Sequence, residues 1–244
     1  MSTTARPPER IVVVVPAWNE RATIPDVVRA VREVTGFEVV VVDDGSTDGT
    51  AQCAREAGAT VLRHPFNVGV GAAVGTGMAY AQRLGADVVV QVDADGQHDP
   101  SAIGALIAVV ADGADLAIGS RFEGGFTMGW VRRTAIRRFA RHVERRLRTP
   151  VPDPTSGFRA FGPRAIDVLT PTFPTAYLSD TVEVLLQAAD RGLVVRSVPV
   201  PMRARQAGQA SAGLWRSAGY ALRIWWILLA HRLPAGRGEA TWTA

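Results

Sequence analysis

Short apolar runs that stop abruptly at polar clusters constrain the fold of this chain more than any other feature. Residues 11–15, 37–42 and 87–92 are rich in valine without regular polar alternation, a pattern typical of strands buried on both faces of a parallel sheet. Residues 23–34 have helical apolar spacing, and residues 71–84 form a segment of small residues that also favours a helix. The alternation predicts an α/β fold, with a mostly parallel central sheet flanked by helices.

The rest of the chain extends this pattern. We expect further strands at 61–62, 115–119 and 194–200, further helices at 46–57, 100–111 and 178–191, and a loop at 150–161. At 244 residues and 47% hydrophobic composition, the chain is long enough for one large domain. We expect a flexible tail at 1–10, the domain at 11–212 and a separate C-terminal segment at 213–244.

Cysteine content and the N-terminal sequence indicate the compartment. Cys53 is the single cysteine, so neither an internal disulfide nor a zinc site of several cysteines is available. The polar, proline-containing start has no apolar segment of the secretory type. We therefore expect a protein of the cytoplasmic side.

The basic charge is concentrated in one segment. Residues 132–148 hold eight arginines and one acid, Glu144, and no lysine occurs in the chain. Arginines recur every four residues, at Arg133, Arg137, Arg141 and Arg145, beside an apolar stripe. This spacing predicts a basic amphipathic helix at about 130–148. Such a helix can lie in a membrane interface; the alternative is a solvated arginine face packed over the sheet. The interleaved residues are aliphatic, so we do not expect nucleic acid as a partner.

The polar clusters at the strand ends are candidates for one shared site. In open parallel sheets, ligands bind outside the carboxyl ends of the strands. Asp93, Asp95 and Gln97 follow the strand at 87–92 and offer the hard oxygen ligands that Mg²⁺ or Mn²⁺ takes when it is shared with a diphosphate. The alternative for these carboxylates is simple capping of the next helix.

Two other strand ends fit a nucleotide. Asp43 and Asp44 can accept hydrogen bonds from a base or a ribose, although turn and capping chemistry explains the same residues. Pro16 and Ala17 offer surfaces for a nucleobase. Glu20 is either part of that site or an ordinary acid in the first turn of a helix.

The glycines at 69, 71, 75 and 77, with Asp93 further on, also resemble a dinucleotide-binding fingerprint. That fingerprint normally follows the first strand of its unit, whereas two strand–helix units precede the glycines here. We therefore interpret them as a helix packed closely on the sheet.

Seven motifs occur in a characteristic order: VVVVPAWNE, VVDDGSTDGT, NVGVGAAVGTGMAYA, VDADGQHDP, AIGSRF, DPTSGFRAF and VPVPMRARQAGQAS. With them, residues 11–212 resemble the family 2 glycosyltransferases of GT-A fold, specifically the dolichol-phosphate mannose synthase type and its bacterial polyprenyl-phosphate relatives. Trp18 stands where these enzymes usually carry tyrosine, so a ring for stacking is kept but a hydroxyl is missing.

The resemblance implies roles for individual residues. It implies a nucleotide site of Pro16, Ala17, Trp18, Glu20, Asp43, Asp44, Asp93 and Ala94, and a metal site of Asp93, Asp95 and Gln97. It implies that Arg121, Arg133, Arg137 and Ser156 face the acceptor phosphate, and that Arg203 and Arg205 meet the diphosphate or close over the site. Asp95, Arg121 and Glu183 are the implied catalytic residues, while Asp153 and Arg159 are candidates for orienting the acceptor, and Gly157 and Phe158 fit turn and packing needs.

The C-terminal segment is apolar and aromatic, but arginines interrupt it. Only 218–230 is nearly continuous, which is shorter than the roughly 20 residues that a membrane span needs. We expect an interfacial or docking helix, with membrane attachment that is peripheral or provided by an anchoring partner protein.

The expected reaction is metal-dependent, inverting transfer of a hexose, mannose or glucose, from a GDP- or UDP-sugar to a polyprenyl phosphate at the cytoplasmic face of the membrane. An acceptor phosphate is already ionised, so no general base is required. The alternative acceptor is a glycan or another hydroxyl group in cell-envelope polysaccharide synthesis. It would need a base, for which Asp180 or Glu183 are candidates. Two further functions compete with sugar transfer: nucleotidyl transfer, which lacks its glycine-rich, lysine-bearing loop here, and service as a non-catalytic nucleotide-sugar-binding subunit.

Overall fold

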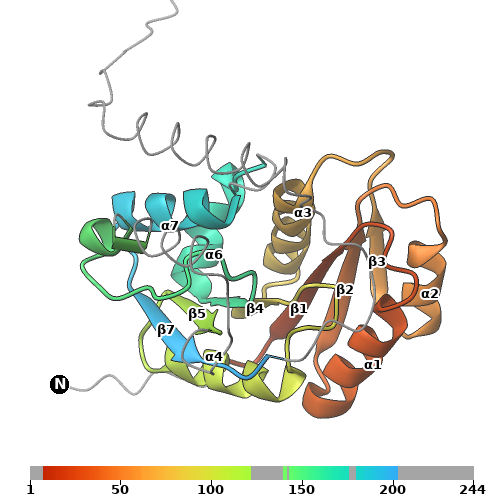
Figure 1. Ribbon diagram of the computed structural model, residues 1–244, viewed down its shortest axis with the longest axis horizontal. Helices are drawn as coiled ribbons and strands as arrows, with labels where there is room; N and C mark the ends of the chain where they lie inside the picture. Colours follow the sequence, from red (N-terminus) through yellow and green to blue (C-terminus); the bar gives the residue numbers. More distant parts are fainter. Residues whose placement is uncertain (1–7, 122–139, 142, 176–179, 203–244) are drawn as a thin grey trace, which may run out of the picture. The chain divides into compact units, whose positions relative to one another are not determined.

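The computed structural model describes residues 8–121, 140–141, 143–175 and 180–202. In this part of the chain, seven strands form one sheet in the order β3-β2-β1-β4-β6-β5-β7 (Figure 1). The strands are β1 (Ile11–Ala17), β2 (Glu38–Asp43), β3 (Thr60–Arg63), β4 (Val88–Gln91), β5 (Leu116–Ser120), β6 (Arg159–Phe161) and β7 (Val195–Pro199).

The direction of β6 decides which loops meet. Every neighbouring pair is parallel except the two that involve β6, which runs antiparallel to β4 and to β5. The prediction of a mostly parallel sheet is confirmed. Because β6 is reversed, its first residue lies at the edge where β4 and β5 end. The chain that leads into β6 therefore lies beside the chain that leaves those two strands.

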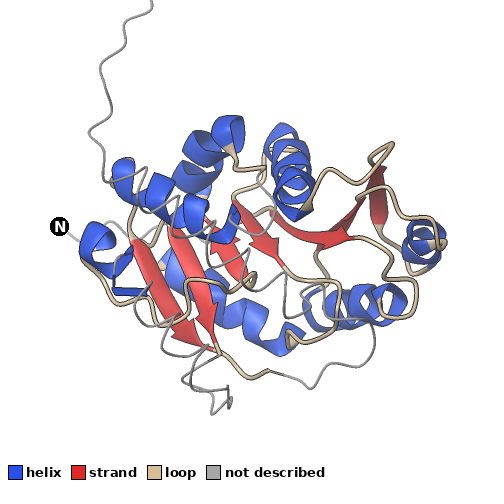
Figure 2. Ribbon diagram, turned by 45° about the horizontal axis from the view of Figure 1, so that its top comes forward, coloured by secondary structure: helices blue, strands red, loops and turns tan. Residues whose placement is uncertain are grey.

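Helices cover both faces of the sheet, as Figure 2 shows. On one side lie α1 (Ile24–Thr35), η1 (Pro100–Ala102) and α4 (Ile103–Ala111); on the other lie α3 (Val70–Arg83), α6 (Pro163–Leu169), η2 (Thr170–Thr172) and α7 (Asp180–Asp190), while α2 (Thr50–Glu56) packs beside β3. The helical apolar spacing of residues 23–34 is confirmed, because the buried residues of α1 are Ile24, Val27, Val28 and Val31. Because both faces are covered, the central strands carry unbroken apolar runs.

The glycine-rich helix packs closely on the sheet, as predicted. A Cβ atom added at Gly77 would lie 2.3 Å from Cγ1 of Val14 in β1, so no larger side chain fits there. The glycines open the helix that follows β3, not β1.

The predicted loop at 150–161 is wrong at its end, because its last three residues form β6. The helix α6, which follows directly, was not predicted either. The sequence Arg-Ala-Phe has no apolar run to indicate a strand. Its first residue is nevertheless among the largest fully buried side chains, with Arg159 only 1% exposed.

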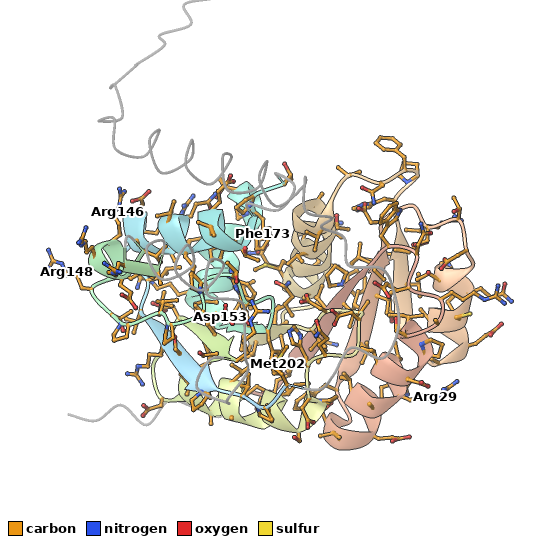
Figure 3. The ribbon with its side chains drawn as sticks, in the orientation of Figure 1. Arg29, Arg146, Arg148, Asp153, Phe173 and Met202 are labelled. Atoms are coloured by element: carbon orange, nitrogen blue, oxygen red, sulfur yellow. The ribbon has the colours of Figure 1, made fainter. Side chains whose placement is uncertain are left out.

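Several predicted features lie outside the described residues, namely Arg133, Arg137, Arg203, Arg205 and the C-terminal segment. Of the basic helix predicted at about 130–148, residues 140–141 and 143–148 are described, and all of these but 148, which lies in a turn, are helical. Ala140 and Val143 of its apolar stripe are buried, whereas the arginines described there are exposed, and Figure 3 shows Arg146 and Arg148 directed outward. This part of the stripe therefore packs into protein.

Residues 8–10, at the end of the predicted tail, are described. The backbone N–H groups of Glu9 and Arg10 both donate to Asp87. Among the described residues, no helix combines the length and the apolar character that a membrane crossing requires.

Candidate functional site

The ends of β1 and β2 are joined by hydrogen bonds into one unit, as their parallel pairing predicts. The Asp44 N–H donates to the carbonyl oxygen of Ala17 at 2.8 Å. Asn19, which has a left-handed φ of 54°, receives a hydrogen bond from the Thr47 N–H at 3.0 Å and donates its own N–H to the Ser46 hydroxyl at 2.9 Å. With this left-handed conformation, Asn19 links the loops after β1 and β2 through two hydrogen bonds.

The aspartate pair at the end of β2 braces the neighbouring loops. Asp44 is buried, and its carboxylate accepts hydrogen bonds from His64 Nδ1 at 2.8 Å and from the N–H groups of Val68 and Gly69 at 3.0 and 2.8 Å. Asp43 is also buried, accepts the Ser46 N–H, and forms an ion pair of 3.1 Å with Arg63 Nε. Hydrogen bonding within the turns, the alternative given for Asp43 and Asp44 from the sequence, therefore accounts for both residues. A role in nucleotide binding would come in addition.

The residues predicted around the base lie at the end of β1. Pro16 and Ala17 are the last two residues of the strand and are buried, so the strand is two residues longer than predicted. Trp18, directly after them, is 49% exposed. The Glu20 carboxylate accepts the Thr23 hydroxyl at 2.8 Å, which holds it in the first turn before α1. An exposed indole ring is thus available at this edge.

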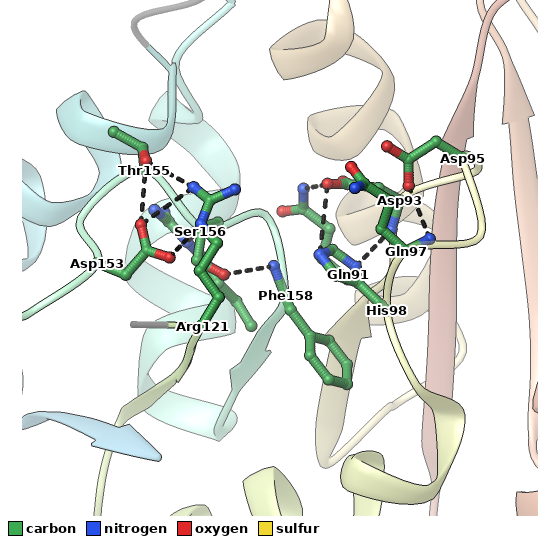
Figure 4. A network of polar contacts seen from close by, with 11 residues as sticks. Gln91, Asp93, Asp95, Gln97, His98, Arg121, Asp153, Thr155, Ser156 and Phe158 are labelled. Carbon is green, nitrogen blue, oxygen red and sulfur yellow. Dashed lines mark hydrogen bonds and ion pairs between the residues drawn. The ribbon is translucent and has the colours of Figure 1, made fainter. Parts of the chain in front are cut away.

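The loop after β4 contains the predicted metal ligands. The Asp93 side chain is 37% exposed, whereas Ala94 is buried. The carboxylate of Asp95 accepts the Gln97 N–H at 3.0 Å. The Asp93 N–H donates to His98 Nδ1 at 3.1 Å, and His98 Nε2 lies 3.7 Å from an oxygen of the Asp93 carboxylate (Figure 4).

This loop has the chemistry of a divalent cation site. Two carboxylates and a carboxamide from a single turn are hard oxygen ligands, and Mg²⁺ is commonly held by one or two carboxylates together with substrate phosphates. Within the described residues, no three His, Cys, Asp or Glu side chains gather as a metal-binding group. The carboxylates of Asp93 and Asp95 and the carboxamide of Gln97 have the chemistry that a cation shared with a diphosphate requires.

The predicted acceptor arginine lies at the end of the next parallel strand. Arg121 follows β5 and donates from Nε and Nη2 to the two Asp153 oxygens at 2.6 and 3.1 Å, and from Nη2 to the Thr155 hydroxyl at 2.9 Å. The Asp153 carboxylate is fully buried, whereas the arginine side chain is 20% exposed. The carboxylate therefore orients the guanidinium of a side chain that is still partly exposed.

Residues 153–158, directly before β6, contain Ser156, one of the residues predicted to face the acceptor phosphate, and we call this segment the acceptor-side loop. Its Ser156 is buried, and the hydroxyl accepts the Phe158 N–H at 3.2 Å. The buried Arg159 donates to the carbonyl oxygens of Ser156 and Pro154 at 2.8 and 3.1 Å. A buried guanidinium that binds the loop backbone keeps the loop in one conformation.

The acceptor-side loop lies directly against the loop after β4, residues 92–98, which contains the predicted metal ligands and which we call the metal-site loop. A Cβ atom added at Gly157 would lie 2.5 and 2.6 Å from the two Asp93 carboxylate oxygens. The rings of His98 and Phe158 stack with centroids 4.8 Å apart and planes 13° from parallel. Figure 4 shows the two polar groups, with Phe158 between them. The reversed direction of β6 makes this contact possible.

The position of Glu183 is given by its helix. It lies in the first turn of α7, which contacts α6 and α3, and its catalytic role stays a prediction. Asn19 and His64 were assigned no role from the sequence. Neither has a local signal beyond its residue type, since their partners come from other loops.

Comparisons with known proteins agree with this geometry. Residues 12–169 match the model of the family described as glycosyl transferase family 2. The chain is 32% identical to a polyprenol monophosphomannose synthase of Mycolicibacterium smegmatis, over 96% of this chain and 93% of that relative. It is 30% identical to an undecaprenyl-phosphate mannosyltransferase of Micrococcus luteus, over 82% and 86%.

A solved structure shares the fold. Glucosyl-3-phosphoglycerate synthase from Mycobacterium tuberculosis, in complex with Mn²⁺, uridine diphosphate and glucosyl-3-phosphoglycerate, superposes with a TM-score of 0.72 at 25% identity, covering 91% of this chain and 79% of that one. The likeness confirms the GT-A type fold. With the family match over most of the chain, the ordered motifs and the strand-end site have one explanation: this chain is a glycosyltransferase and belongs to glycosyl transferase family 2.

Proposed function

We propose that this chain transfers a hexose from a nucleotide diphosphate sugar, GDP- or UDP-linked, to a polyprenyl phosphate, with inversion at the anomeric carbon and with Mg²⁺ or Mn²⁺. Two relatives that span most of the chain are named for mannose transfer to polyprenyl phosphates, which supports the acceptor class. The neighbour solved with Mn²⁺ and uridine diphosphate supports the cation and the donor type.

The observation that carries the proposal is that two chemically different sites lie at the same edge of the sheet, at the ends of β4 and β5, with β6 between these strands. The carboxylates of Asp93 and Asp95 follow β4, while the oriented guanidinium of Arg121 follows β5. The loop before β6 touches both sites. A carboxylate loop suits a cation and its diphosphate, and a guanidinium suits a phosphate. The diphosphate of the donor, which leaves, and the phosphate of the acceptor, which attacks, would thus be held at the same edge of the sheet.

The residues of the chain would divide the reaction between them. Asp93, Asp95 and Gln97 would hold the cation, which when bound neutralises charge on the leaving diphosphate. Arg121 would pair with the acceptor phosphate and hold its oxygen for attack on the anomeric carbon. Because that phosphate is already ionised near neutral pH, no residue need remove a proton. Direct displacement by the acceptor oxygen inverts the anomeric centre.

Other residues would complete the two subsites. Ser156, Arg133 and Arg137 would add to the acceptor side, Arg203 and Arg205 would close on the diphosphate, and Glu183 would orient the reacting groups. Pro16, Ala17, Trp18, Glu20, Asp43, Asp44 and Ala94 would line the nucleotide site, with the exposed Trp18 ring stacking on the base. The reaction would occur at the cytoplasmic face of a membrane, with peripheral attachment or with an anchoring partner protein.

Transfer of radiolabel tests the proposal. Purified protein is incubated with polyprenyl phosphate and a panel of labelled GDP- and UDP-sugars, with MnCl₂, MgCl₂ or EDTA, and label in the organic extract is counted. We expect lipid label that requires metal and is lost in Asp95→Ala. The matched control is Asp26→Ala, which removes an exposed carboxylate that pairs with Arg29 on α1.

Transfer of sugar to a hydroxyl group would contradict the proposal that polyprenyl phosphate is the acceptor. The same donors are therefore offered with 3-phosphoglycerate and with soluble glycans. Metal-dependent transfer to one of these, without lipid label, would overturn the polyprenyl phosphate and redirect attention to a carboxylate that accepts a proton. The absence of both transfer and nucleotide-sugar hydrolysis would favour a non-catalytic subunit.

A further inference from the structure

We propose that His98 is a positioning residue that fixes the Asp93 carboxylate, and that through Phe158 the same ring ties this carboxylate to the acceptor-side loop. The claim about contacts stands on the structure alone. Its consequence for metal and nucleotide binding rests on the proposed function.

His98 is hydrogen-bonded to the backbone of Asp93. His98 Nδ1 accepts the Asp93 N–H at 3.1 Å, so in the neutral ring the proton lies on Nε2. That atom is 3.7 Å from Oδ2 of the Asp93 carboxylate. One imidazole therefore contacts both the backbone and the side chain of the same metal-site residue.

The second step is the fixed orientation of the ring. The His98 side chain is only 5% exposed, and one of its faces stacks on the fully buried Phe158 ring. The backbone of His98 also forms an antiparallel bridge with Met202. Rotation of the imidazole away from Asp93 would break the stack, so the acceptor-side loop helps to hold the ring in place.

The third step is the absence of a side chain at Gly157. Its φ lies outside the left-handed range that favours glycine, so backbone conformation does not require glycine there. The position of the Asp93 carboxylate decides instead, because a Cβ atom would fall within 2.6 Å of both its oxygens, and a larger residue at 157 would force the carboxylate to move. The carboxylate occupies the place that a side chain at 157 would take.

Together these contacts restrain Asp93 from two sides. His98 holds it from within its own loop, and Gly157 borders it from the loop that carries Asp153, the partner of Arg121. Residues that orient a metal ligand commonly change metal affinity 10- to 100-fold when replaced. A shift of the acceptor-side loop would therefore change metal and diphosphate binding, and linkage makes this effect reciprocal.

His98→Phe and Phe158→Leu separate the two contacts. The first keeps a ring for the stack but loses both nitrogens, and the second keeps the nitrogens but loses the stack. The matched control is Phe173→Leu, which removes a ring from the edge-on pair with Phe161, whose centroids are 6.2 Å apart. A second pair of variants is Gly157→Ala and Gly104→Ala, since a Cβ at Gly104 meets nothing within 4 Å.

Two measurements are made on the full chain. The first is amide hydrogen exchange of residues 92–98 and 153–158, with no ligand. We expect faster exchange in both segments for His98→Phe and Phe158→Leu, and no such change in Phe173→Leu. The second is calorimetric binding of GDP and of UDP with MnCl₂ and with EDTA. We expect metal-dependent affinity to fall about 10-fold or more in His98→Phe and Gly157→Ala, with affinity in EDTA unchanged.

The outcomes separate the inference from the proposed function. Unchanged exchange at 153–158 in His98→Phe would overturn the tie between the loops. Changed exchange with wild-type metal-dependent affinity would overturn the positioning role. If the wild-type protein itself bound neither nucleotide more tightly with metal, the proposed function would fail, and the exchange data would still decide whether His98 joins the two loops.

Discussion

Arg121 forms a bidentate ion pair with Asp153, in which Nε and Nη2 donate to the two carboxylate oxygens. The Asp153 side chain has no exposed surface. Removing one partner of a buried pair leaves the other charge uncompensated, and this loss commonly destabilises a protein by about 3–5 kcal/mol. Orientation of the guanidinium and stability of the fold therefore depend on the same contact.

The first prediction separates these two effects. Arg121→Gln should lower the free energy of unfolding by about 3 kcal/mol, measured by urea denaturation. The double variant Arg121→Gln/Asp153→Asn should recover part of this loss, because its buried carboxylate is gone. Both variants should lack transfer to acceptor.

The control is Arg29→Gln, which breaks the exposed pair with Asp26 and should change stability by less than about 1 kcal/mol. Equal destabilisation at the two positions would show that burial of Asp153 has no energetic weight.

The second prediction concerns close packing of α3 on the sheet. Gly77→Ala would bring a methyl group 2.3 Å from Val14 Cγ1, and overpacking of this kind destabilises by about 1–3 kcal/mol. Gly104→Ala meets open space in α4 and should stabilise by about 0.4–1 kcal/mol. Thermal unfolding of the two variants should therefore shift in opposite directions, and a neutral Gly77→Ala would contradict the packing argument.

Much of this architecture follows from local sequence. Valine runs such as Val12–Val15 indicate strands covered on both faces, and an end such as Asp93-Ala94-Asp95 indicates where ligands gather. The strand pattern by itself places the metal-site loop and Arg121 at one edge of the sheet, because parallel strands have their carboxyl ends together.

The missing parts depend on contacts between distant residues. The strand β6 has three residues, and pairing with β4 and β5, rather than its own composition, makes it a strand. Its reversed direction puts Gly157 against Asp93, which no spacing in the sequence indicates. His64 likewise has a role only because Asp44 lies beside it in space.

The third prediction tests the brace made by Asp44. Its carboxylate accepts three N–H donors, from His64, Val68 and Gly69, spread over both oxygens. In Asp44→Asn the amide nitrogen must face at least one of these donors, and an unsatisfied buried group destabilises by about 1–3 kcal/mol. Urea denaturation measures the loss.

The same change at Asp87 is the control. There both N–H donors, from Glu9 and Arg10, reach a single oxygen, so the oxygen of an asparagine can accept both. Asp87→Asn should therefore change stability much less than Asp44→Asn. A comparable loss at the two positions would contradict the argument from donor geometry.

The fourth prediction concerns acid stability and the loop before α2. Burial raises the pKa of the Asp48 carboxyl, but hydrogen bonds from the Thr50 hydroxyl and from the N–H groups of Arg21 and Thr50 outweigh it, so the pKa lies below its ordinary value. A lowered pKa in the folded state stabilises the fold above the unfolded pKa of about 3.9, and this contribution disappears as the pH falls through the folded value.

Asp48→Asn should therefore destabilise the protein by a constant amount between about pH 5 and pH 8, and this difference from wild type should shrink below about pH 4. Urea denaturation across this range measures it. Thr50→Val removes the hydroxyl donor, which lies 2.5 Å from the carboxylate, and should reduce the pH-dependent part. A difference between Asp48→Asn and wild type that is equal at pH 3 and pH 7 would show that this carboxylate is not held in its ionised form by the fold.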